Sequence, residues 1–124
     1  MKDCIFCNLE SSRINNESNF FVSIEDLYPV TKSHTLIISK RHVESYFELS
    51  DQEKKDLITF LDSQRRKLIN KDNSISGFNI GVNDGVDAGQ TIMHFHLHLI
   101  PRRKGDMKDP AGGVRGVIPA EQKY

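Results

Sequence analysis

Three histidines alternate with apolar residues in the last third of the chain. His94, His96 and His98 occur at every second position, separated by Phe95 and Leu97. Successive side chains of a β-strand point to opposite faces, so this spacing places the three imidazoles in one row and the apolar side chains in another. Imidazole at neutral pH can act as a nucleophile, as a general acid or base, or as a metal ligand. The spacing alone does not choose among these roles.

Two cysteines form a second group with the capacity for chemistry. Cys4 and Cys7 are separated by two residues, and they are the only cysteines in the sequence. A C-x-x-C spacing can bring two thiolates to one zinc ion, which then needs two further ligands from elsewhere in the chain. The alternatives are a redox pair and two buried thiols.

The composition of the whole chain limits its partners. Its 124 residues suit a single domain, which we expect to span 1–124, and 17 basic residues balance 17 acidic ones. A net charge of zero provides no overall field to attract nucleic acid or an anionic membrane. The sequence has no apolar run near the roughly 20 residues that cross a bilayer, and its first residues lack the apolar core of a signal peptide. We therefore expect a cytoplasmic protein with no nucleic-acid partner and no membrane partner.

Four segments are expected to be strands. Segments 20–24 and 34–39 are rich in β-branched and aromatic residues, and the continuous apolar run of 34–39 predicts a strand covered on both faces. Segment 77–83 and the histidine segment 94–100 complete the set. Segment 84–90 contains Gly85 and Gly89 and is expected to be a loop that leads into the histidines, and 15–19 is expected to be another loop.

One long helix is predicted to begin after Ser50. Ser50 and Glu53 match the S-x-x-E capping box, in which each side chain binds the other residue's free backbone N–H. Apolar residues then follow at helical spacing, and the helix should end near 70–73. The order strand, strand, helix, strand, strand predicts an α+β domain with an antiparallel sheet. Residues 1–12 should form a short helical turn that carries the thiols, and 101–124 should be an extended C-terminal tail.

The histidine segment and several shorter motifs resemble one known family. Residues 89–100 carry the pattern His-φ-His-φ-His-φ-φ, with φ apolar, which resembles the signature of the histidine triad (HIT) superfamily. The resemblance to bacterial members of its Hint-like branch extends to four other segments: Cys4-Ile5-Phe6-Cys7, Asp26-Leu27-Tyr28-Pro29 with His34 downstream, Gly81-Val82-Asn83-Asp84-Gly85 and the C-terminal segment. It therefore covers nearly the whole chain.

This resemblance implies a nucleotide hydrolase or transferase that acts at the α-phosphate through a covalent nucleotidyl-histidine intermediate. Nucleoside phosphoramidates or dinucleoside polyphosphates would be its substrates. The nucleophile of the family maps onto His96, and His98 would hydrogen-bond the phosphate. His34 would lie beside the leaving group or the phosphate. Thr91 stands where relatives commonly carry a serine that contacts the phosphate or protonates the leaving group.

The resemblance also implies the residues that bind the substrate. Asp26 and Leu27 would hold the nucleoside of a purine nucleotide or nucleotide conjugate, with the Asp26 carboxylate accepting from both ribose hydroxyls. Without the resemblance, Asp26 would be interpreted as a turn residue before Pro29. Asn83 would face the phosphate, and Gln90 would face the leaving group.

A structural zinc site follows from the same resemblance. The ligands of bacterial relatives map onto Cys4, Cys7, His42 and His94, which makes 1–12 a zinc-binding N-terminal turn. A site filled by four protein ligands has no open position for substrate, so the zinc would be structural. The family architecture would be a sheet of about five strands in a homodimer, whose C-terminal tail near Arg115 would reach the partner's active site.

Two other functions are compatible with these residues. One is a nucleotide-binding or regulatory module that does not turn over its ligand. The other is a zinc-dependent metallohydrolase in which the triad itself forms an open metal site; chelation would then abolish chemistry in a folded protein.

Overall fold

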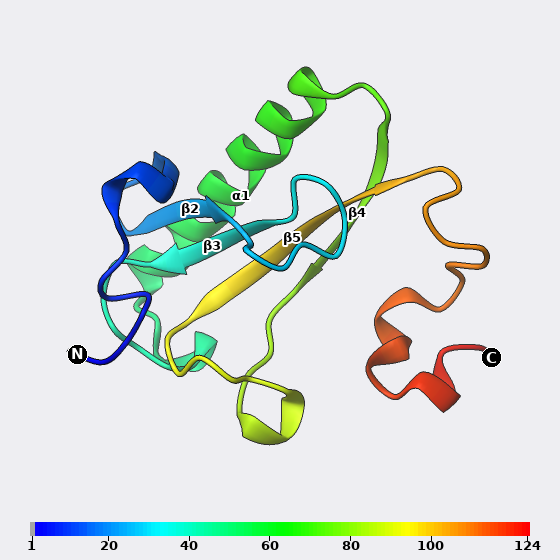
Figure 1. The fold of residues 1–124 in the computed structure, drawn as a ribbon. Coiled ribbons are helices and arrows are strands. Elements are labelled where there is room, and N and C mark those ends of the chain that lie inside the picture. The colour runs from blue at the N-terminus through cyan, green and yellow to red at the C-terminus, as the bar shows by residue number, and fades with distance from the viewer. Residues whose placement is uncertain (1) are drawn as a thin grey trace.

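The computed structural model describes residues 2–124 and contains a five-stranded antiparallel sheet with one long helix against it (Figure 1). The strands lie in the order β1-β2-β3-β5-β4, and each neighbouring pair is antiparallel. Their bounds are β1 Ile14–Glu17, β2 Phe21–Glu25, β3 Thr35–Ser39, β4 Ile75–Gly81 and β5 His96–Arg103. The predicted α+β class is confirmed. Within residues 2–124, no helix has both the length and the apolar character needed to cross a membrane.

Helix α1, Asp51–Lys71, begins where the capping box predicts. The Ser50 hydroxyl accepts from the Glu53 backbone N–H at 3.1 Å, and a Glu53 carboxylate oxygen accepts from the Ser50 N–H at 2.8 Å. The same buried carboxylate pairs with Arg41 at 2.7 Å. This ion pair and the hydrogen bonds of the capping box hold the pKa of Glu53 below its ordinary value.

The alternation of side chains along the strands divides the apolar residues between two faces of the sheet. On the α1 face, Phe95, Leu97 and Leu99 of the histidine segment pack with the helix residues Leu57 and Phe60. The opposite face carries a second cluster, which consists of Phe6, Val22, Ile24, Leu36 and Ile38. Strand β3 contributes to both clusters, as its continuous apolar run predicts.

Three segments differ from the sequence-based expectations. The segment 15–19, predicted as loop, instead contributes its first three residues to the short edge strand β1, Ile14–Glu17, whose polar sequence gives no strand period. Residues 2–8 form turns rather than a helix, and the first helical element is a 3-10 turn at Ser11–Arg13. The C-terminal tail contains two further 3-10 turns, Gly113–Val117 and Pro119–Glu121. Such short elements leave no periodic pattern in a sequence.

Candidate active site and metal centre

Two of the three histidines lie within a strand. His96 and His98 lie in β5 opposite Ile38 and Leu36 of β3, on the face of the sheet away from α1. His94 lies just before the strand: the next residue, Phe95, gives its backbone N–H to the Val43 carbonyl at 2.6 Å, while its own carbonyl still accepts from the Ser39 N–H at 3.3 Å. The strand predicted from residue 94 therefore begins at His96, and the predicted row is confirmed for His96 and His98.

A backbone carbonyl fixes the tautomer of His96. Its Nδ1 lies 2.8 Å from the carbonyl oxygen of His94. A carbonyl only accepts hydrogen bonds, so Nδ1 carries the proton and Nε2 of the neutral ring keeps its lone pair. The edge contact with Phe6, at 5.1 Å between ring centroids, holds the ring from the other side. His96 is thus oriented with an unprotonated ring nitrogen, the form of imidazole that acts as a nucleophile.

A second chain of hydrogen bonds orients His98. The Val30 backbone N–H donates to His34 Nδ1 at 3.0 Å, so the proton of neutral His34 lies on Nε2. That Nε2–H donates to His98 Nδ1 at 2.9 Å. The proton of neutral His98 therefore lies on its own Nε2, where it can be donated to an anion.

Burial keeps both of these rings neutral. Burial, with smaller electrostatic contributions from His96 and His34, lowers the pKa of His98 to about 4. Burial also lowers the pKa of His34, and this effect is opposed by the Asp26 carboxylate, 3.5 Å from Nε2. At neutral pH the pair is uncharged, which is the state that the chain of hydrogen bonds requires.

A cleft of about 430 Å³ opens beside these histidines. Its polar lining consists of Arg13, Asp26, His34, Asn83, Thr91, His96 and His98. Its apolar lining is contributed by the N-terminal turn, by β2 and β3, and by the segment before β5; it includes Ile5, Phe6, Ile24, Leu36 and Ile92. The cleft therefore combines apolar and polar side chains, with His96 and His98 among its lining residues.

The predicted nucleoside-binding residues lie at the rim. Asp26 accepts from the Tyr28 backbone N–H through Oδ1 at 2.8 Å, while its Oδ2 faces His34. This contact is the turn role that the sequence alone favours, and it leaves Oδ2 toward the cleft. Leu27 is 67% exposed and lines the same cleft, as does Tyr28.

Gln90 is placed away from the cleft. Its side chain is 5% exposed, and its Oε1 accepts from the Gly85 N–H at 2.8 Å. Its Nε2 donates to the carbonyls of Glu44 and Ile92 at 2.9 and 3.2 Å. The amide is therefore bonded at both ends within the protein and holds the loop 84–92 in place, instead of facing a leaving group.

Two of the four predicted metal ligands meet through their ring nitrogens. The Nδ1 atoms of His42 and His94 are 3.1 Å apart. The Nε2 of His94 lies 2.7 Å from the Ser39 carbonyl oxygen, so it carries the proton and the lone pair of Nδ1 is free to bind a metal.

The two thiols complete the group. Cys4 Sγ is 3.4 Å from His94 Nδ1, and Cys7 Sγ is 3.2 Å from His42 Nδ1 and 3.5 Å from His94 Nδ1. All four ligand atoms lie within 4.8 Å of one another. A tetrahedral ion with bonds of about 2.0 Å to nitrogen and 2.3 Å to sulfur would separate two nitrogens by about 3.3 Å and a nitrogen from a sulfur by about 3.5 Å. The residues fit such an ion.

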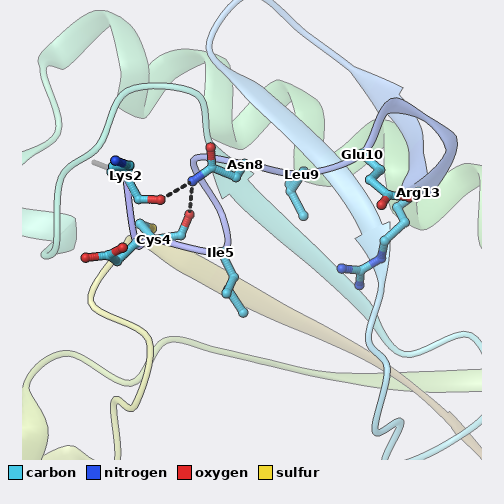
Figure 2. A pocket seen from close by; sticks show the side chains of 8 residues that line it. Lys2, Cys4, Ile5, Asn8, Leu9, Glu10 and Arg13 are labelled. Carbon is cyan, nitrogen blue, oxygen red and sulfur yellow. Dashed lines mark hydrogen bonds between the residues drawn. The ribbon is translucent and has the colours of Figure 1, made fainter.

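The N-terminal turn that carries these thiols is held by Asn8. Its side-chain amide donates to the carbonyls of Lys2 and Cys4 at 3.0 and 2.8 Å, as Figure 2 shows. The Cys7 backbone N–H also donates to the Cys4 carbonyl at 3.1 Å. Ile5 extends from the same turn over the sheet, so the turn serves both the metal group and the cleft.

A second group, Asp26, His34 and His98, also brings three ligand atoms together. It suits a metal less well, because His34 Nε2 carries a proton as long as Nδ1 accepts from Val30. His96 belongs to neither group. The structure therefore does not bring the three imidazoles of the triad around one ion, as a metallohydrolase site would need.

Phe6 is a site residue that the sequence analysis did not assign. Its ring makes edge contacts with His96 and with His94, the latter at 6.0 Å between centroids. The only signal in the sequence is its position between the predicted metal ligands Cys4 and Cys7. Because these two thiols approach His94, Phe6 must also lie close to the histidine segment.

Known proteins are similar to this chain in sequence and in fold. The family model for the HIT domain matches residues 10–105. The chain belongs to the HIT family. Among its relatives, Protein hit of Bacillus subtilis is 34% identical over 85% of this chain and 75% of its own length. The bis(5'-nucleosyl)-tetraphosphatase [asymmetrical] of Schizosaccharomyces pombe is 37% identical over 79% of this chain, which spans about half of that relative, 53% of its length.

The HIT fold is equally clear from solved structures. A Zn-bound histidine triad family protein from Mycobacterium smegmatis superposes with a TM-score of 0.77 and is 32% identical, covering 87% of this chain and 81% of its own. The fold and family membership of the chain therefore rest on both sequence and structure.

Proposed function

We propose that this HIT protein hydrolyses nucleotide conjugates at the α-phosphate, with His96 as the nucleophile. The observation that carries the proposal is the pair of opposed tautomers in β5. The His94 carbonyl leaves His96 with a lone pair on Nε2, and the chain through His34 leaves His98 with a proton on Nε2. A lone pair for the phosphorus and a proton for its oxygens are the two contributions that such a transfer needs.

The reaction balances in two steps. In the first, the Nε2 lone pair of His96 forms a bond to the α-phosphorus, and the bond to the leaving group breaks with its electron pair on the departing atom, which takes up one proton. In the second, water attacks the same phosphorus, the bond to His96 breaks, and the free nucleotide and one proton are released. The ring of His96 is cationic in between, and the His94 carbonyl that accepts its Nδ1–H stabilises that charge.

The other cleft residues are assigned to binding. The His98 Nε2–H and the side chains of Asn83 and Thr91 would contact the phosphate, with the Thr91 hydroxyl near the leaving atom. The Asp26 carboxylate would accept from the ribose hydroxyls, for which its Oδ2 is available. The apolar side chains of the cleft, which include the exposed Leu27, suit a purine base.

We also propose that the Cys4, Cys7, His42 and His94 group holds a structural zinc. With four protein ligands the ion would have no open position, and its contribution would be to tie the N-terminal turn to the segment before β5. The cleft draws on the N-terminal turn, the sheet and the loop before β5, which supports a single functional domain over 1–124. Strand β4 lies at one edge of the sheet, where it could pair with a second copy of the chain, which supports a homodimer.

Mass spectrometry of the intact protein tests the central step. Mixing the protein with adenosine 5′-phosphoramidate or diadenosine tetraphosphate and quenching in base, in which a phosphoramidate bond survives better than in acid, should trap a chain heavier by one adenylyl group. The His96→Ala variant should keep its fold by circular dichroism and show neither the adduct nor turnover. A folded His96→Ala protein with the wild-type rate would overturn the proposal. Binding of these nucleotides without turnover by the wild type would favour a regulatory module instead.

A further inference from the structure

A second hollow of about 580 Å³ lies on the other side of the paired histidines. We name it the tail groove, because residues of the C-terminal tail line it together with β4 and β5; the tail residues are Met107, Pro110, Gly113, Val114, Gly116, Val117 and Gln122. It shares four lining residues with the nucleotide cleft: Val30, His34, Asn83 and His98. The two hollows therefore meet at a group of residues that includes His98 and Asn83, which are assigned to the phosphate.

The tail is tied both to the sheet and to itself. Arg102 of β5 holds Asp106 through two bonds of 2.7 and 2.8 Å, which fixes the start of the tail. Lys123 pairs with Asp109 at 2.9 Å and closes the segment into a loop. Gly112 has a φ of 92°, and a Cβ at that position would overlap the Gln122 carbonyl, so the loop needs glycine there. The wall that the tail contributes to the groove is thus held by specific contacts.

The groove is apolar and has no free cation. Its apolar lining includes Ile80, Val82, Ile100, Met107, Val114 and Val117. Within the described part of the chain, Arg102 is the one lysine or arginine that lines it. The guanidinium of Arg102 is already engaged by Asp106 and by the Asn79 side chain, the latter at 2.7 Å.

This charge pattern bears on the kind of substrate. Phosphate groups beyond the α-phosphate are anionic and are bound in proteins by arginine, lysine, metal ions or clustered N–H groups. Apart from the two histidines and Asn83 that it shares with the cleft, the tail groove offers one paired arginine, the amides of Asn79 and Gln122, and a set of aliphatic side chains. Two of the aliphatic side chains, Val114 and Val117, are 64% and 76% exposed. Apolar surface of this kind gains free energy when an apolar group covers it.

We propose that the tail groove binds the leaving group of the substrate, and that this group has an uncharged apolar body and is not a polyphosphate chain. The inference rests on the proposed function, since it assumes that the α-phosphate lies at His96 and His98. When the bond from phosphorus to the leaving atom breaks, that atom takes one proton and the apolar product departs through the groove. Val114 and Val117 are then determinants of specificity for the leaving group.

Three adenylyl substrates that differ only in the leaving group test this inference. They are adenosine 5′-phosphoramidate, its N-benzyl derivative and diadenosine tetraphosphate. We expect the wild type to have its highest kcat/KM with the N-benzyl substrate. Val114→Asp and Val117→Asp should each lower the ratio of kcat/KM for the N-benzyl substrate to that for the unsubstituted one by about 10-fold, within the range for discrimination by apolar contacts.

A matched control comes from the same tail. Ile118 is also exposed, at 59%, but does not line the groove, so Ile118→Asp should leave the ratio at its wild-type value. Higher kcat/KM for diadenosine tetraphosphate than for the N-benzyl substrate would overturn the inference. The inference would also be overturned if Val114→Asp and Val117→Asp kept the wild-type ratio of kcat/KM for the N-benzyl and unsubstituted substrates. This includes the outcome in which the two variants change only the oligomeric state, because the valines would then belong to an interface between copies of the chain. In each of these cases turnover would persist, whereas failure of the proposed function would abolish the adenylyl adduct with all three substrates.

Discussion

The Nε2–H of His34 donates to His98 Nδ1 across 2.9 Å, and the Val30 backbone N–H holds the far nitrogen of the His34 ring. A backbone amide thereby determines, through two rings, which nitrogen of His98 carries a proton. The contact with Val30 fixes both the orientation and the tautomer of the His34 ring. A rotated or flipped His34 ring would present no N–H donor to His98.

Substitution of His34 should therefore impair catalysis through His98. We expect His34→Ala to lower kcat by about 100-fold, the size of effect produced by a misplaced catalytic group. His34→Gln can supply an N–H donor near Nε2 and should recover part of the loss. Steady-state kinetics with adenosine 5′-phosphoramidate would measure both. Equal rates for the alanine and glutamine variants would argue that His34 acts only by filling space.

The low pKa of His98 predicts how stability depends on pH. An unfolded histidine takes up a proton near pH 6.5, whereas burial lowers the pKa of His98 to about 4 in the folded protein. Between these values the unfolded state binds more protons, so the free energy of unfolding should fall as the pH drops from about 6.5 toward 4. Urea unfolding at several pH values would measure this, and His98→Asn should flatten the slope. An unchanged slope in the variant would assign the dependence to other groups.

The elements that could be predicted from the sequence depend on local patterns. The Ser50 and Glu53 side chains need only each other and the adjacent backbone, so a four-residue motif predicts the start of α1. The apolar run of β3 likewise contains its own evidence, because a strand covered on both faces needs apolar residues at consecutive positions. Both predictions are confirmed.

The features that could not be predicted depend on distant backbone. His94 lies outside strand β5 because the Val43 carbonyl accepts the N–H of Phe95, and no pattern near the histidines encodes that contact. Strand β1 has the sequence of a polar loop and owes its form to pairing with β2. The tail groove depends on Arg102 holding the tail at Asp106, a pair that looks like ordinary surface charge in the sequence.

Removal of the metal should affect stability more than chemistry. If zinc binds the folded chain and is present at a few hundred times its Kd, it contributes roughly 3–4 kcal/mol, and its loss would lower Tm by about 10 °C. Differential scanning calorimetry with and without a chelator would measure the shift, and Cys7→Ser should reproduce it. Below the lowered Tm the adenylyl adduct on His96 should still form. Loss of the adduct from chelated but folded protein would mean that the ion takes part in the reaction.

Loss of the helix cap should be purely structural. Ser50→Ala removes the acceptor for the Glu53 N–H and should lower the free energy of unfolding by about 1 kcal/mol. Chemical denaturation would measure this cost. The kcat of the folded variant should equal that of the wild type, because α1 covers the opposite face of the sheet from the cleft. A lowered kcat would indicate that α1 is coupled to the histidines through the sheet.

Substitution of Gln90 tests whether its side chain stabilises the loop 84–92 or binds the leaving group of the substrate. Gln90→Ala would leave the Gly85 N–H and the Glu44 and Ile92 carbonyls without their side-chain partner, and each buried group left unpaired costs about 1–3 kcal/mol. We expect a lower Tm and faster proteolysis within 84–92, since this amide joins the loop to the Glu44 carbonyl and adds to the backbone bond from the Gln90 N–H to the Gly85 carbonyl. Gln90→Glu keeps the acceptor for Gly85 but places a carboxylate oxygen against the Glu44 and Ile92 carbonyl oxygens, so its Tm should fall at least as far as that of Gln90→Ala. If Gln90 instead met the leaving group, both variants would keep the wild-type Tm and would change kcat/KM by different factors for the N-benzyl and unsubstituted phosphoramidates.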